Sequence, residues 1–130
     1  MTEFTFDHIH LFTRNPEATA AFYERMFGAE VMRSMQQGKP RIDLKLGGAN
    51  IFILDVSQDP KAVAGPEHPH QGLDHFGLEV KSIDAVCGDL KAKGAVFTRE
   101  PVTIRPGTRI AFLTGPEGVS IELLERTPVA

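Results

Sequence analysis

Apolar and polar side chains alternate along residues 6–13 and again along residues 73–80. Alternation with a period of two is typical of a strand that buries one face. Three further strand-like stretches follow in each half of the chain, at about 29–36, 40–47 and 49–55 and at about 95–99, 107–114 and 118–125. The pattern therefore predicts four strands in each half.

A helix is predicted after the first strand of each half. Asn15 is a favourable N-cap and Pro16 fits the first helical position, while Ser82 is the expected cap of the second helix. Gly28 and Gly94 are expected to end the two helices as C-caps. The predicted buried stripes are Ala18, Ala21, Phe22 and Met26 in the first helix and Ile83, Val86 and Leu90 in the second.

The order of one strand, one helix and three strands thus occurs twice, and the sequence repeats with it. FDHIHLFT at 6–13 parallels LDHFGLEV at 73–80, and GANIFILD at 48–55 parallels GVSIELLE at 118–125. The predicted fold class is therefore α+β, with two βαβββ modules.

We expect a single domain over 1–130, with module one at about 4–56 and module two at about 73–126. The stretch at about 57–72 is the expected linker, because its Pro and Gly residues exclude a central strand or helix. Four strands backed by one helix leave one sheet face uncovered. We therefore expect the modules to face each other and form a half-barrel cleft of about eight strands, backed by the helices.

Strand alternation also predicts which side chains face this cleft. His8, His10 and Phe12 alternate with apolar residues that should pack under the first helix, and His75 and Glu122 take the same face in the second copy. Two neutral imidazoles and one carboxylate suit a divalent first-row metal and leave positions open for substrate or water. We expect His8, His75 and Glu122 to bind one such ion.

Charged side chains on other strands are expected beside this metal. Arg41 and Lys45 alternate with an apolar set, and Arg109 is expected to turn inward because Ile110 and Phe112 are assigned to the packed face. Cationic groups near a metal favour an anionic, oxygen-rich substrate, although the same alternation also fits an ordinary solvated face. The predicted substrate-binding residues are Arg41, Lys45, Phe52, Arg109 and Phe12.

Two further residues are candidates for proton transfer. Asp43 is the expected general base if the reaction abstracts a proton. His10 lies two residues from His8 on the same face. It fits three roles equally well: an additional metal ligand, a residue that supports the ligands, or a proton donor. The sequence does not choose among these roles.

Composition narrows the function class. The chain has 130 residues, 42% of them hydrophobic, and a formal net charge of −3, so it lacks the cationic excess that binding to nucleic acid or anionic lipid needs. No window approaches the roughly 18 apolar residues of a membrane span. The only cysteine, Cys87, cannot form an intramolecular disulfide. We expect a cytoplasmic protein that acts on a small molecule, without nucleic-acid or membrane partners.

Three motifs resemble the vicinal oxygen chelate superfamily: DHI at 7–9, DHFGLEV at 74–80 and GPEGVSIEL at 115–123. That group includes glyoxalase I, methylmalonyl-CoA epimerase, fosfomycin-resistance enzymes, extradiol ring-cleaving dioxygenases and bleomycin-resistance proteins. The resemblance implies two βαβββ modules, metal ligands at His8, His75 and Glu122, and a homodimer. Glyoxalase I and the epimerase use a fourth ligand, Glu or Gln, where the repeat places Phe52, so the expected set is similar to that of the three-ligand members.

Three functions stay open. The favoured one is a metal-dependent lyase, isomerase or group-transfer enzyme that uses Mn, Fe, Co, Ni or Zn on a small oxygenated, anionic substrate. The second is an Fe(II) extradiol-type dioxygenase, although Tyr23 lies in the predicted first helix rather than near the metal. The third is a non-catalytic drug-binding protein of the bleomycin-resistance kind. His68 and His70, in the linker, are expected to be a lid, an adventitious metal contact or neither.

Overall fold

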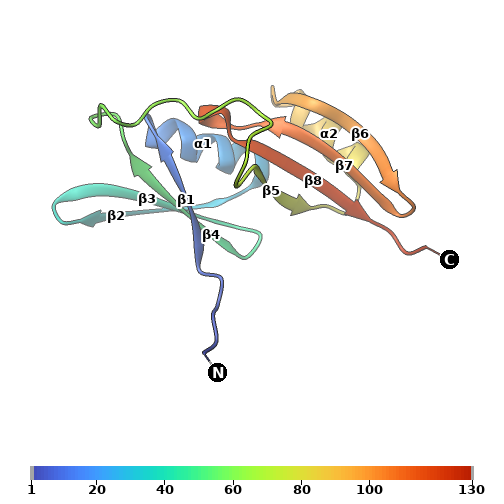
Figure 1. Cartoon of the computed structure of the whole chain (residues 1–130), viewed down its shortest axis with the longest axis horizontal. Helices are drawn as coiled ribbons and strands as arrows, with labels where there is room; N and C mark the ends of the chain where they lie inside the picture. Colours follow the sequence, from blue (N-terminus) through green and yellow to red (C-terminus); the bar gives the residue numbers. More distant parts are fainter. Residues whose placement is uncertain (1, 130) are drawn as a thin grey trace. The chain divides into compact units, whose positions relative to one another are not determined.

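Each half of the chain contains one strand, one helix and three further strands (Figure 1). The computed structural model describes residues 2–129, so the two ends of the predicted domain, residues 1 and 130, lie outside the described residues. Two compact units divide the chain, Met1–Val63 and Ala64–Ala130. The prediction of an α+β fold built from two βαβββ units is confirmed.

The first unit contains β1 (His8–Thr13), α1 (Pro16–Phe27), β2 (Glu30–Gln36), β3 (Lys39–Leu46) and β4 (Ala49–Asp55). The second contains β5 (His75–Glu79), α2 (Ile83–Ala92), β6 (Val96–Arg105), β7 (Thr108–Thr114), a short 3₁₀ turn at Pro116–Gly118 and β8 (Ser120–Arg126). In the described chain, residues 56–74 hold no helix or strand.

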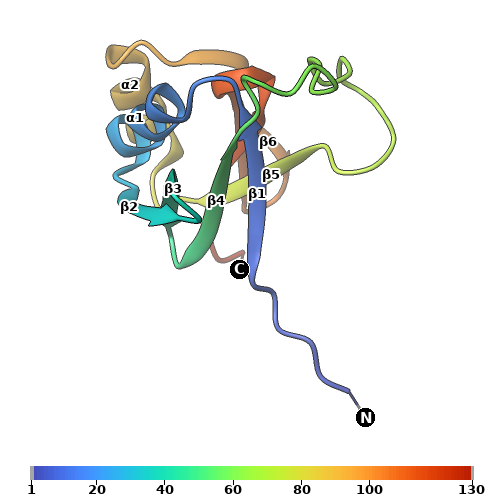
Figure 2. The same cartoon turned by 90° about the vertical axis from the view of Figure 1, so that its left-hand side faces the viewer.

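Both units arrange their four strands in the same order. The sheets read β1-β4-β3-β2 and β5-β8-β7-β6, and in each the first strand pairs in parallel with the last. Figure 2 shows β1 and β4 side by side in the first unit. The internal repeat of the sequence is thus a repeat of topology, so a position in one unit has a defined counterpart in the other.

The helix ends follow the local chemistry closely. The Asn15 side chain accepts a hydrogen bond from the Ala18 N–H at 3.0 Å, and Gly28 caps α1 in the left-handed conformation with φ 70°. Ser82 precedes α2 as predicted but makes no side-chain cap bond. Gly94 is not the cap of α2, because the helix closes on Lys93 and the glycine follows with φ 92°.

Of the four residues predicted to be buried on α1, only Met26 is buried. Ala18 and Ala21 are exposed and Phe22 is half-buried, whereas the buried set is Thr19, Ala20, Tyr23 and Met26. Burying the large Tyr23 ring removes more apolar area from water than burying two alanines. The Thr19 hydroxyl is satisfied inside the core by a 2.8 Å hydrogen bond with Thr13.

The second unit packs α2 against β6, β7 and β8. Ile83, Cys87 and Leu90 form the buried stripe of α2, and the predicted Val86 is only half-buried. Burial raises the pKa of the Cys87 thiol, as expected for a small core residue. β6 continues to Arg105, beyond its predicted end, because it is an edge strand, where a proline is tolerated.

The faces of β7 are the reverse of those predicted. Ala111 and Leu113 are fully buried, and Ala111 pairs with Leu123, whose side chain is also buried. Phe112 instead pairs with Glu122 and so shares its open face. Arg109 lies on the helix side, where its Nη1 donates to Asp84 Oδ2 of α2 at 2.7 Å. Residues 110–113 are all apolar, so their sequence does not show which of them face the helix.

Among the described residues, no helix is long and apolar enough to cross a membrane.

Candidate metal centre

Each sheet has one face packed against its helix and one open face. In β1 the exposed His8, His10 and Phe12 alternate with the half-buried Ile9 and Leu11, as predicted. The open face of the first unit therefore presents both histidines. In the second unit the register brings His75, Gly77 and Glu122 to the corresponding open face.

His75 and Glu122 approach each other on this face. His75 Nε2 lies 3.5 Å from Glu122 Oε1, and both side chains are partly exposed. Gly77, the register partner of Glu122, leaves room for the carboxylate, since a Cβ at residue 77 would stand 3.3 Å from Oε1. The Phe112 ring meets the His75 ring edge-on at 4.9 Å, so an apolar side chain flanks this pair.

Each open face carries the same Asp–His dipeptide, in which the carboxylate contacts the neighbouring imidazole. Asp74 Oδ2 lies 2.7 Å from His75 Nδ1, and Asp7 Oδ2 lies 2.7 Å from His8 Nδ1. An ionised carboxylate only accepts hydrogen bonds, so in the neutral ring each Nδ1 carries the proton and each Nε2 keeps its lone pair. Histidines that bind metals are commonly oriented in this way.

The pKa of Asp74 is lowered, first by the hydrogen bond with His75 and then by the one with His68. Asp74 therefore stays ionised and keeps its orienting role across the neutral range.

The spacing of these donors suits a divalent ion. Nitrogen and oxygen ligands lie about 2.0–2.2 Å from zinc, so adjacent ligand atoms on one ion stand about 3–3.5 Å apart. The separation of 3.5 Å between His75 Nε2 and Glu122 Oε1 falls at the upper end of this range. The spacing of His75 and Glu122 is therefore compatible with two ligands of one metal ion.

The first unit places an aromatic ring where the second places its carboxylate. Phe52 pairs with His10 on one side and Asp43 on the other, as Glu122 pairs with Gly77 and Phe112. The His8 ring stacks on the Phe52 ring at 4.1 Å, and the Arg41 guanidinium lies 4.9 Å from the centre of that ring. The expected equivalence of Phe52 and Glu122 thus follows from the register.

Arg41 and Asp43 form an ion pair on this open face. Arg41 Nε donates to both Asp43 oxygens, at 2.9 and 3.2 Å. Asp43 must give up part of this pairing before it can accept a proton from a substrate. The hydrogen bonds of Arg41 within the described residues use only Nε, which leaves its terminal nitrogens for an anionic ligand.

The pKa of the His10 imidazole is lowered. Burial is the main cause, electrostatic repulsion by His8 and Arg41 adds to it, and Asp43 opposes the shift. His10 is therefore neutral at neutral pH, and one ring nitrogen is able to accept a proton.

Arg109 is removed from the candidate site by its position on the helix face. The sequence interpretation also missed the contributions of Asp7, Asp74 and Phe112. The repeated Asp–His dipeptide was a usable signal for the two carboxylates, because an acid next to a metal-binding histidine often orients it. No comparable pattern in the sequence indicated the contact of Phe112 with His75.

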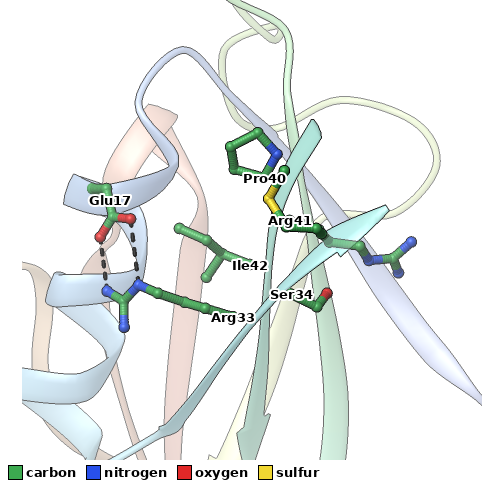
Figure 3. Close-up of a pocket in the computed structure, with 7 residues that line it drawn as sticks. Glu17, Arg33, Ser34, Pro40, Arg41 and Ile42 are labelled. Atoms are coloured by element: carbon green, nitrogen blue, oxygen red, sulfur yellow. Dashed lines mark hydrogen bonds and ion pairs between the residues drawn. The ribbon is translucent and has the colours of Figure 1, made fainter. Parts of the chain in front are cut away.

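A surface hollow of about 340 Å³ lies elsewhere in the first unit (Figure 3). Its lining residues are Glu17, Arg33, Ser34, Met35, Pro40, Arg41 and Ile42. Arg33 pairs in register with Ile42 and bonds Glu17 of α1 at 2.7 Å, so this part of the hollow is on the helix side of the sheet. Figure 3 shows the Arg41 guanidinium directed away from the Glu17–Arg33 pair. Arg41 lines this hollow too, while its guanidinium lies beside Phe52 on the open face.

Comparison with known proteins agrees with the fold of each unit. The model of the Glyoxalase/Bleomycin resistance protein/Dioxygenase superfamily matches residues 5–123. The chain belongs to this superfamily. Among relatives of this glyoxalase-superfamily protein, a probable lactoylglutathione lyase of Vibrio cholerae is 42% identical over 123 residues, covering 91% of this chain and 88% of that protein.

Glyoxalase I of Saccharomyces cerevisiae is 27% identical over 143 residues, covering 91% of this chain. The alignment spans only 44% of that longer relative. The solved structure of a glyoxalase family protein from Enterococcus faecalis has a TM-score of 0.72 at 30% identity, covering 93% of this chain and 97% of that one. The resemblance deduced from the sequence motifs is thus confirmed.

Proposed function

We propose that this protein is a metal-dependent, lyase-type enzyme in which His8, His75 and Glu122 hold one divalent metal ion. The observation that carries the proposal is the 3.5 Å approach of His75 Nε2 to Glu122 Oε1, with Asp74 behind the imidazole. Relatives named lactoylglutathione lyase support the reaction class. We further propose a small, oxygenated, anionic substrate.

His8 is the proposed third ligand because its surroundings repeat those of His75. Each histidine opens the first strand of its unit and each is bonded at Nδ1 by the preceding aspartate. Two imidazoles and one carboxylate accept Mn, Fe, Co, Ni or Zn. Such an ion, when bound, supplies Lewis-acid polarisation of a substrate oxygen.

The other side chains on the open face of the first unit have proposed roles toward the substrate. The terminal nitrogens of Arg41 bind its anionic group, with Lys45 adding positive charge. Phe12 and Phe52 provide apolar wall. His10, neutral at neutral pH, and Asp43, once released from Arg41, are the candidates for moving a proton.

The absence of a carboxylate at Phe52 has a consequence for the reaction. With three protein ligands, more positions remain for two substrate oxygens than in a four-ligand site. By resemblance, this pattern is similar to that of the three-ligand members of the superfamily. We therefore propose lyase, isomerase or group-transfer chemistry on a substrate with two neighbouring oxygens.

The two alternative functions receive less support. An extradiol-type dioxygenase would be expected to use a tyrosine near the metal, but Tyr23 is fully buried on α1 and does not reach the open face. A non-catalytic binder of the bleomycin-resistance kind has no need for the oriented His75–Glu122 pair. By resemblance we also propose that the enzyme acts as a homodimer, which sedimentation equilibrium would test.

Elemental analysis of tag-free protein tests the proposal. The wild type, His8→Ala, Glu122→Gln and the control Glu79→Gln would each be loaded with a divalent metal, dialysed and assayed for lactoylglutathione lyase activity. Glu79 is a suitable control because it is an exposed carboxylate on β5, bonded only to Arg126 at 3.4 Å among the described residues. We expect one equivalent of metal to disappear in the first two variants and to persist in Glu79→Gln. Equal metal content in all four proteins would overturn the metal centre.

A further inference from the structure

A second group of metal-ligating side chains lies in the segment that precedes β5. His68, His70 and Asp74 each offer a ligand atom, and these atoms lie within 4.8 Å of one another. We propose that these three residues form a second, separate metal site that takes a borderline transition-metal ion such as Zn²⁺. The proposal does not depend on the metal centre at Glu122.

The backbone brings both imidazoles to the same carboxylate. His68 Nδ1 lies 2.8 Å from Asp74 Oδ1, and the His68 and His70 rings are 5.3 Å apart and tilted by 31°. Two histidines separated by one residue thus present their rings to one side of the segment. Two nitrogens and one oxygen are a donor set that zinc, nickel, cobalt and copper prefer over magnesium or calcium.

The hydrogen bond of His70 favours the neutral tautomer that binds a metal. Its Nδ1 lies 2.9 Å from the backbone carbonyl oxygen of Gln71, which only accepts hydrogen bonds. The proton of the neutral ring is therefore on Nδ1, and Nε2 keeps a lone pair for the ion. A carbonyl that fixes the opposite ring nitrogen is a common support for metal-binding histidines.

Asp74 can contact both His75 of the candidate metal centre and His68 of the second site, because its carboxylate has two oxygens. Oδ2 contacts His75 Nδ1, while Oδ1 contacts His68. A metal ion held at Oδ1 would replace the hydrogen bond with His68 and leave the contact with His75 in place. The pair formed by Asp7 and His8 has no such extension, since residues 2–6 contain no histidine.

The surroundings allow a hydrated ion to enter. The side chains of His68 and Asp74 are each 42% exposed, and His70 is half-buried. The site is therefore open on one side, where water would complete the coordination. Neutral imidazoles and one carboxylate would leave one net positive charge on the bound ion.

Isothermal titration of tag-free, full-length protein with Zn²⁺ alone tests the second site. The proteins compared are the wild type, Glu122→Gln, His70→Ala and the double variant Glu122→Gln/His70→Ala. Gln71→Ala is the matched control, because only the backbone carbonyl of this residue is used. We expect two equivalents of zinc in the wild type and in Gln71→Ala, one in each single variant and none in the double variant.

The outcomes separate the two metal sites. If His70→Ala binds as much zinc as the wild type, the second site is wrong whatever happens at Glu122. If Glu122→Gln loses nothing while His70→Ala loses one equivalent, the proposed catalytic centre is wrong and the second site stands. If each single variant abolishes all binding, the histidines belong to one shared site and the proposal of a separate site falls.

Histidine ¹H–¹⁵N spectra provide an independent check on folded protein. Zinc added to Glu122→Gln should shift the Nε2 resonance of His70, and this shift should be absent in Glu122→Gln/His68→Ala. An unchanged His70 resonance in Glu122→Gln would also overturn the proposal.

Discussion

Phe52 on β4 and Glu122 on β8 stand at the same register position of two units with the same topology. Phe52 is flanked by His10 and Asp43, whereas Glu122 is flanked by Gly77 and Phe112. In the first unit the aromatic ring is on the last strand and the acid is on the strand before it, and in the second unit these positions are reversed. In the first unit the acid is on β3, tied to Arg41, and the aromatic ring occupies the position of a metal ligand.

Phe52→Glu should therefore convert a three-ligand set into a four-ligand set. We expect the affinity for the divalent metal to rise on the order of tenfold, equivalent to about 1.4 kcal/mol. Loss of the stacking with His8 should lower the free energy of unfolding by about 0.5–1.5 kcal/mol. Competition titration with a chelating dye measures the first effect, and urea denaturation measures the second.

Phe52→Leu is the control for this substitution, since it removes the ring without adding a ligand. Its metal affinity should match that of the wild type. Equal affinity of Phe52→Glu and Phe52→Leu would show that residue 52 does not adjoin the metal.

The space beside Glu122 gives a second prediction. In Gly77→Ala the new Cβ would stand 3.3 Å from Glu122 Oε1, so the carboxylate must move by a few tenths of an ångström relative to His75. We expect the metal affinity to fall about tenfold or more. Circular dichroism should remain unchanged, because Gly77 does not have the positive φ that alanine would resist.

Gly88→Ala is the matched glycine substitution. Gly88 lies within α2 and has open space where the alanine methyl group would stand, so this change should stabilise the fold by about 0.5–1 kcal/mol and leave metal affinity unchanged. If both glycine variants lose metal affinity equally, the absence of a side chain at Gly77 has no specific role in the site.

Much of this arrangement was predictable, because local chemistry and strand alternation determine it. The Asn15 cap of α1 and the open-face positions of His8, His75 and Glu122 follow from residue types within a few positions of each other. Which side chains of β7 face the helix was not predictable, since residues 110–113 are all apolar and could be buried on either face. Arg109 was misplaced for this reason.

Two other features were not predictable from the sequence, for a similar reason. The stripe predicted for α1 contains Ala18, Ala21, Phe22 and Met26, whereas the tertiary packing buries the bulkier Tyr23. The contacts of Asp74 depend on a segment with no regular secondary structure, in which sequence spacing carries no directional information. Both features require three-dimensional packing rather than periodicity.

The aspartate behind His8 gives a third prediction. Asp7→Asn weakens the contact at Nδ1 and allows the amide to present either a donor or an acceptor. We expect metal affinity to fall about 10–100-fold without a change in fold, because the Asp7 side chain is largely exposed. Glu3→Gln, an exposed acid in the same segment, should bind metal like the wild type. If both variants bind metal equally well, Asp7 has no orienting role.

Arg109 and Asp84 provide a fourth prediction, which concerns stability rather than catalysis. The hydrogen bond from Arg109, aided by its charge, lowers the pKa of Asp84 in the folded state. A group with a depressed folded pKa stabilises the fold above its unfolded pKa, and this stabilisation is lost as the pH falls through the folded value. Arg109→Met should therefore lower the urea midpoint at pH 7, and the difference from the wild type should vanish in acid.

The same variant distinguishes a structural from a substrate-binding role for Arg109. Because the guanidinium lies on the helix side of β7, Arg109→Met should leave metal binding and the Michaelis constant unchanged. Arg41→Met, which removes the cation beside Phe52, should instead raise the Michaelis constant for an anionic substrate. A midpoint difference that persists in acid would assign the effect of Arg109 to packing of its aliphatic stem rather than to the ion pair.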